Sequence, residues 1–341
     1  MGSETKFRLD LGRLWPYVNI QYCRAWIFGC LLLLCPSSSA LYAQEKQEAQ
    51  VSDEAPFNFK TKTLGGKQFW TDHAWREGWR IQHNALTDHW RLIDPKNVRW
   101  AWGTRGQCQQ VLLQQVPEVT IHPDGYVILL HGLMRSSGSM HSIGEYLHRE
   151  LLCQAVYFEY ASTRGTIAHH AAALADVIEG LPDDGPIYFV GHSMGNIVVR
   201  HYLGDLERSD QQQKQTGRIQ SVVMLGPPNQ GAAIARQLSK TGVFGWLAGQ
   251  GAVQLGPGWQ ELEKNLVVPK CPFGIVAGKL SDPLPDNPLV EGDSDFVVSV
   301  EEAKLQGAAD LLEVNQVHSF LMDSPEVQAA TVKFIRTNRF K

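Results

Sequence analysis

The chain has 341 residues, of which 43% are hydrophobic and 19% are charged, and its formal net charge is −4 at pH 7. A chain of this length can bury a sizeable core as one large domain or two small ones. Its composition excludes a disordered tail, a coiled coil and a collagen-like fibre. The sequence has no clustered Lys/Arg face, so we expect no nucleic-acid partner.

The first 43 residues have the features of an export signal. Basic residues ending at Arg24 precede an apolar run over residues 25–35, which is shorter than the ~20 residues that a helix needs to span a bilayer. A proline and three serines end the run, and small residues follow up to Ala43. We expect cleavage after Ala43, with Ala40 as the alternative site. The segment predicts a periplasmic or secreted protein; a membrane anchor through the uncleaved segment is the alternative.

Three cysteines lie beyond this signal: Cys108, Cys153 and Cys271. Export permits a disulfide, but an odd number leaves at least one thiol free or paired elsewhere. The His169-His170 doublet is expected on a helix surface rather than in a metal site. We expect neither a metal nor an organic cofactor.

Residues 44–120 precede the regular part of the chain. Residues 44–60 are polar and predict a flexible lead-in. Six of the ten tryptophans follow in a Trp-rich extension, at Trp70, Trp75, Trp79, Trp90, Trp100 and Trp102. Some of these rings could share a helix face, and the stretch at 89–93 could equally be a strand. The rings either pack the extension against the main domain or form a surface for lipid or substrate.

From Gly125 onward, apolar runs alternate with amphipathic segments. The run at 126–130 is apolar throughout, which is typical of a strand buried on both faces. The other expected strands lie at 155–160, 187–190, 222–225, 273–277 and 311–314, and the expected helices at 136–152, 167–179, 194–203 and from 324 onward. The alternation predicts an α/β domain over residues 121–341, with a mostly parallel sheet and helices on both faces.

The pattern Gly-x-Ser-x-Gly occurs once, around Ser193, between an apolar strand and an apolar helix. The glycines permit a sharp turn that exposes the Ser193 hydroxyl above the sheet edge, and the helix N-terminus adds positive potential. We therefore expect Ser193 to be a nucleophile. The backbone N–H groups of Leu133 and Met194 could bind an oxyanion. His131, at the end of the first strand, is expected to be structural.

A serine hydroxyl needs a neighbouring base. His318 is the only histidine beyond position 201, and in the order Ser, Asp/Glu, His the base comes last. The acid must lie between Ser193 and His318. Asp295, before a short apolar run, is the first candidate, Asp282 the second and Asp293 the third.

The chain resembles the α/β-hydrolase family, and within it bacterial lipases and esterases. The matching pieces are Leu130-His131-Gly132-Leu133, Gly191-His192-Ser193-Met194-Gly195, Leu225-Gly226-Pro227-Pro228-Asn229-Gln230-Gly231, Asp293-Ser294-Asp295-Phe296-Val297-Val298 and Val317-His318-Ser319-Phe320. The resemblance covers residues 125–340 and implies Ser193 as nucleophile, His318 as base and Asp295 as acid. Such lipases usually have Asn-Asp-Gly at the acid, where this chain has Ser294-Asp295-Phe296.

Residues 232–268 form a long connection, with six glycines between 242 and 258 and apolar rings among them. In lipase-like enzymes this region caps the acyl pocket, so either a lid that opens on a lipid or a cap that stays packed is expected.

Together these features predict a serine hydrolase that cleaves a carboxylic ester or lipid through an acyl-enzyme, with peripheral contact to a lipid surface as a further expectation. An amidase, a thioesterase, an acyltransferase and a non-catalytic binding protein on the same fold are the alternatives.

Overall fold

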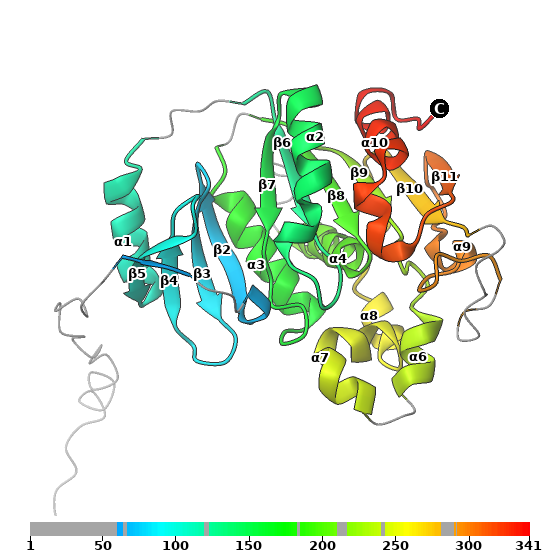
Figure 1. Ribbon diagram of the computed structural model, residues 1–341, viewed down its shortest axis with the longest axis horizontal. Coiled ribbons are helices and arrows are strands. Elements are labelled where there is room, and N and C mark those ends of the chain that lie inside the picture. Colours follow the sequence, from blue (N-terminus) through cyan, green and yellow to red (C-terminus); the bar gives the residue numbers. More distant parts are fainter. Residues whose placement is uncertain are drawn as a thin grey trace, which may run out of the picture. The chain divides into compact units, whose positions relative to one another are not determined.

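The computed structural model describes residues 60–63, 67–118, 123–182, 185–209, 217–239, 243–280, 290 and 292–341. The expected export signal, the lead-in before residue 60 and the expected boundary near residue 120 lie outside these residues. The described residues contain a parallel sheet and an antiparallel sheet (Figure 1). Both sheets belong to one compact unit that begins at Glu54.

The parallel sheet has six strands in the order β11-β10-β9-β8-β6-β7, and every neighbouring pair is parallel. The strands are β6 (Tyr126–Leu130), β7 (Gln154–Phe158), β8 (Ile187–His192), β9 (Ile219–Leu225), β10 (Phe273–Gly278) and β11 (Asp310–Val314). Parallel strands direct all their carboxyl ends to one edge of the sheet, where loops can bring side chains from several strands together.

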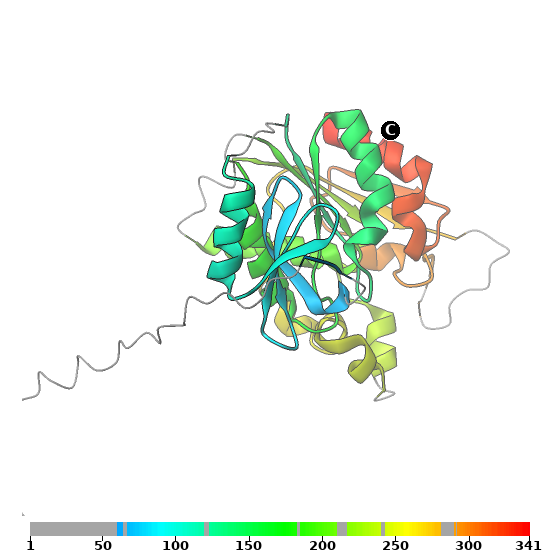
Figure 2. The ribbon, with the colours of Figure 1, turned by 60° about the vertical axis from the view of Figure 1, so that its left-hand side comes forward.

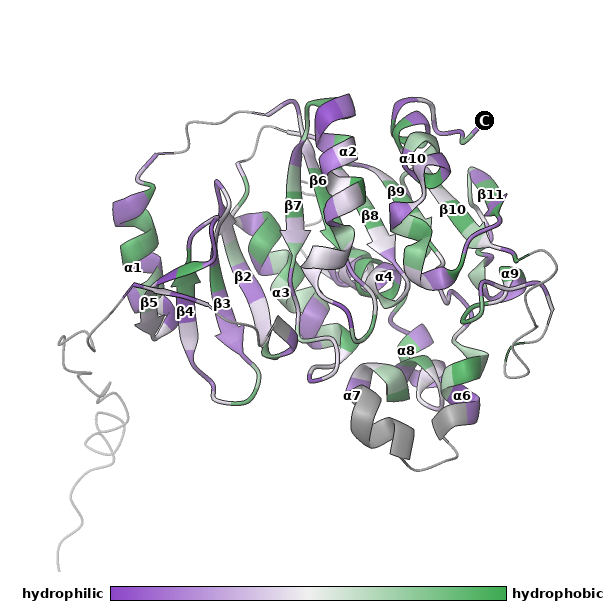
Figure 3. Cartoon of the chain, viewed as in Figure 1, coloured by the Kyte–Doolittle hydropathy of each residue, from purple (hydrophilic) through white to green (hydrophobic). Residues whose placement is uncertain are grey.

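Helices cover both faces of this sheet (Figure 1). They are α2 (His141–Leu151), α3 (Ile167–Glu179), α4 (Met194–Arg208) and α10 (Pro325–Thr337). Along β6, Tyr126, Ile128 and Leu130 pack in the core that contains α3 and α4. Val127 and Leu129 point the other way, into the core that contains α2 and α10. Burial on both faces explains the unbroken apolar run, visible as green on β6 in Figure 3. The expected α/β class is confirmed.

The Trp-rich extension folds as an antiparallel sheet in the order β1-β5-β4-β3-β2, called the N-terminal sheet below. Its strands are β1 (Thr61–Lys62), β2 (Trp70–Arg76), β3 (Trp79–Asn84), β4 (Trp90–Ile93) and β5 (Val98–Gly103), preceded at β2 by the short helix η1 (Lys67–Phe69). Helix α1 (Arg105–Gln115) lies along the sheet (Figure 2) and buries Cys108 and Leu112 against Ile81 and Leu92. The tryptophans therefore lie on strands rather than on a helix.

The N-terminal sheet joins the main domain at the end of β7. The Asp72 N–H donates to the Glu159 carbonyl at 2.9 Å, and the Glu159 N–H donates to Asp72 Oδ2 at 2.8 Å. The register of β2 shifts between Asp72 and Ala74, and His73 at that point contacts Asp176 of α3 at 2.7 Å. An irregularity of this kind re-aims a side chain. Here it directs His73 to the helix that covers the main sheet.

Asp72 makes this junction sensitive to pH. Burial raises the pKa of its carboxyl from 3.8 to about 6, although the Arg80 charge opposes the change. The folded protein therefore holds this proton more tightly than the unfolded chain. The protonated Asp72 carboxyl therefore stabilises the fold fully below pH 4. This stabilisation is lost as the pH rises through 6, so the free energy of unfolding falls by about 3 kcal/mol. We expect Asp72→Asn to lack this fall in the free energy of unfolding between pH 4 and 7, measured by denaturant titration.

The matched control is Asp323→Asn, which changes an exposed carboxylate and should keep the wild-type pH profile. Identical pH profiles for Asp72→Asn and the wild type would contradict the assignment.

The two histidines at 169 and 170 on α3 were both expected on the helix surface, but only one of them is exposed. His169 is exposed, but His170 is only 2% exposed and lies against the Tyr160 ring at a centroid distance of 4.7 Å. Burial lowers the pKa of His170 to about 3. The expectation of a surface doublet was wrong for His170, because neighbouring positions on a helix point about 100° apart and only one of the two faces outward.

The remaining helices of the described residues are α6 (Ala233–Ser239), α7 (Val243–Leu255), α8 (Trp259–Glu263) and α9 (Val300–Ala303), with the short helices η2 (Ser137–Met140) and η3 (His318–Asp323). None of the helices in the described part of the chain is long and apolar enough to cross a bilayer. Cys108, Cys153 and Cys271 are all free thiols.

Candidate active site

Ser193 occupies the turn between β8 and α4. Its backbone has φ 53° and ψ −123°, a conformation that non-glycine residues adopt rarely and that costs roughly 1–3 kcal/mol. The Ser193 N–H donates to the Leu225 carbonyl of β9 at 2.8 Å, which helps to hold this turn. The strained turn matches the exposed-serine geometry that the sequence pattern predicts.

The glycines on either side of Ser193 are required by close contacts. A Cβ at Gly191 would lie 2.3 Å from Asn196 Oδ1, and a Cβ at Gly195 would lie 2.7 Å from the Leu130 carbonyl. The second contact involves backbone of β6, which cannot move aside as a flexible side chain could. Both glycines therefore let the first turn of α4 lie directly against the ends of β6 and β8.

His318 and Asp295 form a buried pair. Asp295 Oδ2 lies 2.7 Å from His318 Nδ1, and the carboxylate is 1% exposed. Asp295 Oδ1 accepts the backbone N–H groups of Val297 at 3.0 Å and Val298 at 2.8 Å. With the carboxylate as acceptor, the proton of the neutral ring lies on Nδ1, and Nε2 keeps its lone pair. The pair therefore presents a proton acceptor.

The His318 ring lies next to the Ser193 turn. Its centroid is 4.7 Å from that of His192, the residue immediately before Ser193. A Cβ at Gly226 would lie 2.9 Å from His318 Nδ1, and Gly226 directly follows Leu225, which accepts the Ser193 N–H. Ser193 follows β8, Asp295 comes after β10 and His318 follows β11, so the structure brings all three residues to the carboxyl edge of the same sheet.

His192 is a residue of this site that the sequence analysis did not single out. Its Nε2 lies 2.9 Å from the His318 carbonyl. Burial lowers the pKa of His192 well below 6.5, and a positive charge on His318 would lower it further. A neutral His192 can donate to the carbonyl and hold the backbone of His318. The position of His192 inside the Gly-x-Ser-x-Gly pattern could have identified it from the sequence.

The two other acid candidates are placed differently. Asp293 has a side chain 59% exposed and pairs with Lys279 Nζ at 2.8 Å, while Asp282 lies outside the described residues. Phe296, at the position where the resemblance leads us to expect glycine, has φ 85°. Glycine adopts this positive φ easily, so Phe296 holds it at a cost in strain. Among the described carboxylates, Asp295 contacts His318.

The predicted oxyanion donors lie beside Ser193. Met194 is the first residue of α4, where backbone N–H groups lack partners within the helix. Leu133 belongs to the loop after β6, called the 131–137 loop below. A Cβ at Gly132 would lie 3.1 Å from Ser193 Cβ and 2.9 Å from His192 Nδ1. The loop therefore packs directly against the serine turn.

His131 lies behind this loop. Its ring is fully buried and stacks on Tyr160 at a centroid distance of 4.1 Å. His131 Nδ1 donates to the Gly132 carbonyl at 2.8 Å, and the Arg135 N–H donates to the same carbonyl at 3.2 Å. The C=O and N–H of a trans peptide point in opposite directions. Anchoring the Gly132 carbonyl therefore fixes the direction of the Leu133 N–H.

Helix α7 packs against the side chains of Met194 and Leu133, the two residues that carry the predicted donors. A Cβ at Gly251 would lie 2.8 Å from Met194 Sδ and 3.5 Å from Leu133 Cδ1. Gln254 Oε1 accepts the Ile167 N–H at the start of α3 at 2.8 Å. The described end of α7, around Gly251 and Gln254, therefore packs next to the serine turn, the 131–137 loop and the start of α3. The side chains of Phe244, Trp246 and Leu247 are not among those described.

The described residues contain no group of three or more His, Cys, Asp or Glu side chains that could hold a metal ion. The chemistry of the site as described consists of a hydroxyl, an imidazole, a carboxylate and backbone N–H groups.

The model of the alpha/beta hydrolase family matches residues 127–331, well over half of the chain. The structure is similar to the mature lipase BlEst2 of Bacillus licheniformis, with 18% identity, a TM-score of 0.50 and coverage of 64% of this chain and 94% of that chain. It is also similar to a metagenomic carboxyl esterase, with 17% identity, a TM-score of 0.46 and coverage of 58% of this chain and 65% of that chain. A further similar structure is phospholipase PlaB of Legionella pneumophila, with 17% identity, a TM-score of 0.39 and coverage of 52% of this chain and 45% of that chain. No curated protein matches the sequence.

Proposed function

Because the chain belongs to the alpha/beta hydrolase family, we propose that it is a serine hydrolase of carboxylic esters, with Ser193 as nucleophile, His318 as base and Asp295 as acid. The observation that carries the proposal is the buried 2.7 Å contact between His318 and Asp295 beside a serine with a strained backbone. Strain of this kind is characteristic of functional sites.

The reaction proceeds in two acyl-transfer steps. His318 Nε2 takes the proton of Ser193 as the hydroxyl oxygen attacks the ester carbonyl, and the Leu133 and Met194 N–H groups stabilise the oxyanion. The intermediate collapses, and the alcohol leaves with the proton from Nε2. Water then attacks the acyl-enzyme in the same way, which releases the acid and restores Ser193. Asp295 stabilises the imidazolium in both steps.

An ester or lipid is the substrate class that this site fits best. Apolar side chains lie next to the serine: Met194 and Leu133 pack against α7 at Gly251, and Met194 belongs to a buried hydrophobic cluster that also contains Leu255. An apolar wall suits an acyl chain better than a charged group. Amides, thioesters and acyl transfer to an alcohol use the same intermediate and are distinguished by assay.

The test uses the purified full chain and a fluorophosphonate probe, which reacts with activated serines. We expect the wild type to be labelled and Ser193→Ala to remain unlabelled, because the variant lacks the attacking oxygen. A panel of p-nitrophenyl esters, anilides and thioesters should then give the largest kcat/KM for an ester. Absence of wild-type labelling would favour a binding protein, and a larger kcat/KM for an anilide or thioester would replace the ester assignment.

A further inference from the structure

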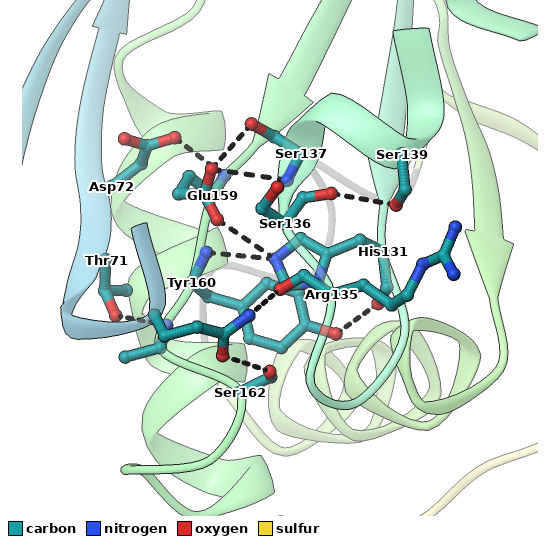
Figure 4. A network of polar contacts seen from close by, with 12 residues as sticks. Thr71, Asp72, His131, Arg135, Ser136, Ser137, Ser139, Glu159, Tyr160 and Ser162 are labelled. Carbon is teal, nitrogen blue, oxygen red and sulfur yellow. Dashed lines mark hydrogen bonds and ion pairs between the residues drawn. The ribbon is translucent and has the colours of Figure 1, made fainter. Parts of the chain in front are cut away.

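A continuous set of polar contacts joins the N-terminal sheet to the 131–137 loop (Figure 4). The residues of this set come from η1 and β2, from the segment after β7 and from the loop itself. They are distant in sequence: the contact between Gln68 and Arg135 spans 67 positions. These contacts reach the backbone of the loop that carries Leu133, so the extension is linked to the loop of the candidate oxyanion site.

Gln68 makes the most direct of these contacts. Its Nε2 donates to the Arg135 carbonyl, and its Oε1 accepts the Ser162 hydroxyl at 3.2 Å. Ser162 Oγ in turn accepts the Met134 N–H at 3.1 Å. One amide side chain therefore fixes the two residues that follow Leu133, one directly and the other through a fully buried serine.

Met134 and Arg135, the two residues that Gln68 fixes, depend on such contacts. Met134 has φ 59° and a side chain that is 59% exposed, so little packing holds its left-handed backbone. Arg135 also reaches across the site, because its guanidinium donates to the Ser319 carbonyl at 3.2 Å, directly after His318. The position that Gln68 fixes is thus connected to both the oxyanion donors and the base.

A second arm holds the other end of the loop. Glu159 Oε2 accepts the Ser137 N–H at 3.2 Å and the Ser137 hydroxyl at 2.7 Å. Glu159 Oε1 lies 3.4 Å from His131 Nε2. Asp72, in turn, accepts the Glu159 N–H. Both carboxylates are 2% exposed, so this arm is shielded from water and links β2 to the loop through Glu159.

We propose that Gln68 is a positioning residue for ester hydrolysis, through which η1, directly before the N-terminal sheet, fixes the 131–137 loop of the main domain. The inference rests on the proposed function. Its physical basis is that oxyanion stabilisation depends on donors held within tenths of an ångström, so a loop released by ~1 Å loses much of the rate. Binding of the ground-state ester depends less on this alignment.

The test compares Gln68→Ala, Gln68→Glu and the matched control Gln110→Ala, which removes an exposed amide from α1 of the same extension. Gln68→Glu keeps the volume and the acceptor for Ser162 but replaces the donor to the Arg135 carbonyl with an oxygen. We expect both Gln68 variants to lower kcat about tenfold or more with KM within about threefold. The rate of fluorophosphonate labelling should fall by a similar factor.

The unfolding midpoint and circular dichroism spectrum establish that each variant is folded. A folded Gln68→Glu with wild-type kcat would overturn the inference, because a role in packing alone survives this substitution. Loss through KM with kcat unchanged would overturn it as well. Wild-type protein that is not labelled at all would instead contradict the proposed function, so the two failures are distinguishable.

Discussion

Replacing His318 with alanine is expected to lower kcat for ester hydrolysis by about four to six orders of magnitude. The variant removes the group that takes the Ser193 proton, and a neutral hydroxyl at pH 7 is a weak nucleophile. Steady-state hydrolysis of a soluble p-nitrophenyl ester measures this loss. KM should change far less, because the imidazole contributes little to holding the ground-state ester.

The control is His169→Ala, which removes an exposed histidine from α3 and should leave kcat within twofold of the wild type. A double variant, Ser193→Ala with His318→Ala, should be no slower than Ser193→Ala alone, since residues that act as a unit are not additive. Retention of more than a tenth of the wild-type kcat in folded His318→Ala would contradict its role as base.

Much of the main domain could be predicted from local patterns. Helix α3 has the predicted bounds, 167–179, because Thr166 caps its first turn and Gly180 follows its last residue. Each central strand is a short apolar run, as expected for a strand that is buried on both faces. The strand ends differ by a few residues, since hydrogen bonding extends β9 back to Ile219, before its continuous apolar stretch.

The N-terminal sheet could not be predicted in the same way. Trp75 and Trp79 are four positions apart, as on one helix face, yet they lie on β2 and β3 on either side of a turn at 77–78. Glu77 and Gly78 both have positive φ, and the Glu-Gly pair is a weaker turn signal than Asn-Gly or Asp-Gly. Pairing across a sheet depends on partners that spacing along the chain does not reveal.

In the candidate site, the reacting residues could be predicted from motif and chain order, but the residues that hold them in place could not. The Gly-x-Ser-x-Gly pattern selected Ser193, and the order Ser, Asp, His together with the single late histidine selected His318. The structure places His318 next to the serine turn and in contact with Asp295. Gln68 and Glu159 carry no motif, because their partners lie across tertiary contacts. Such supporting residues become visible only when the fold brings their hydrogen bonds together.

Asp295→Asn is expected to lower kcat about 10⁴-fold, because it reverses the polarity of one contact. Oδ1 is held by the N–H groups of Val297 and Val298, so the amide oxygen of the variant stays there and its NH2 faces His318 Nδ1. The ring must then accept at Nδ1 and carry its proton on Nε2, where it cannot take the Ser193 proton.

Ester kinetics with matched controls measure the effect of Asp295→Asn. Asp293→Asn changes the exposed partner of Lys279 and should keep kcat within about twofold, since it removes a surface ion pair. Asp282→Asn, the remaining alternative acid, should behave like Asp293→Asn. If either control loses more activity than Asp295→Asn, the acid is assigned to the wrong carboxylate. If Asp295→Asn keeps a tenth or more of the wild-type kcat while folded, the tautomer argument fails, because a ring with its proton on Nε2 could not sustain that rate.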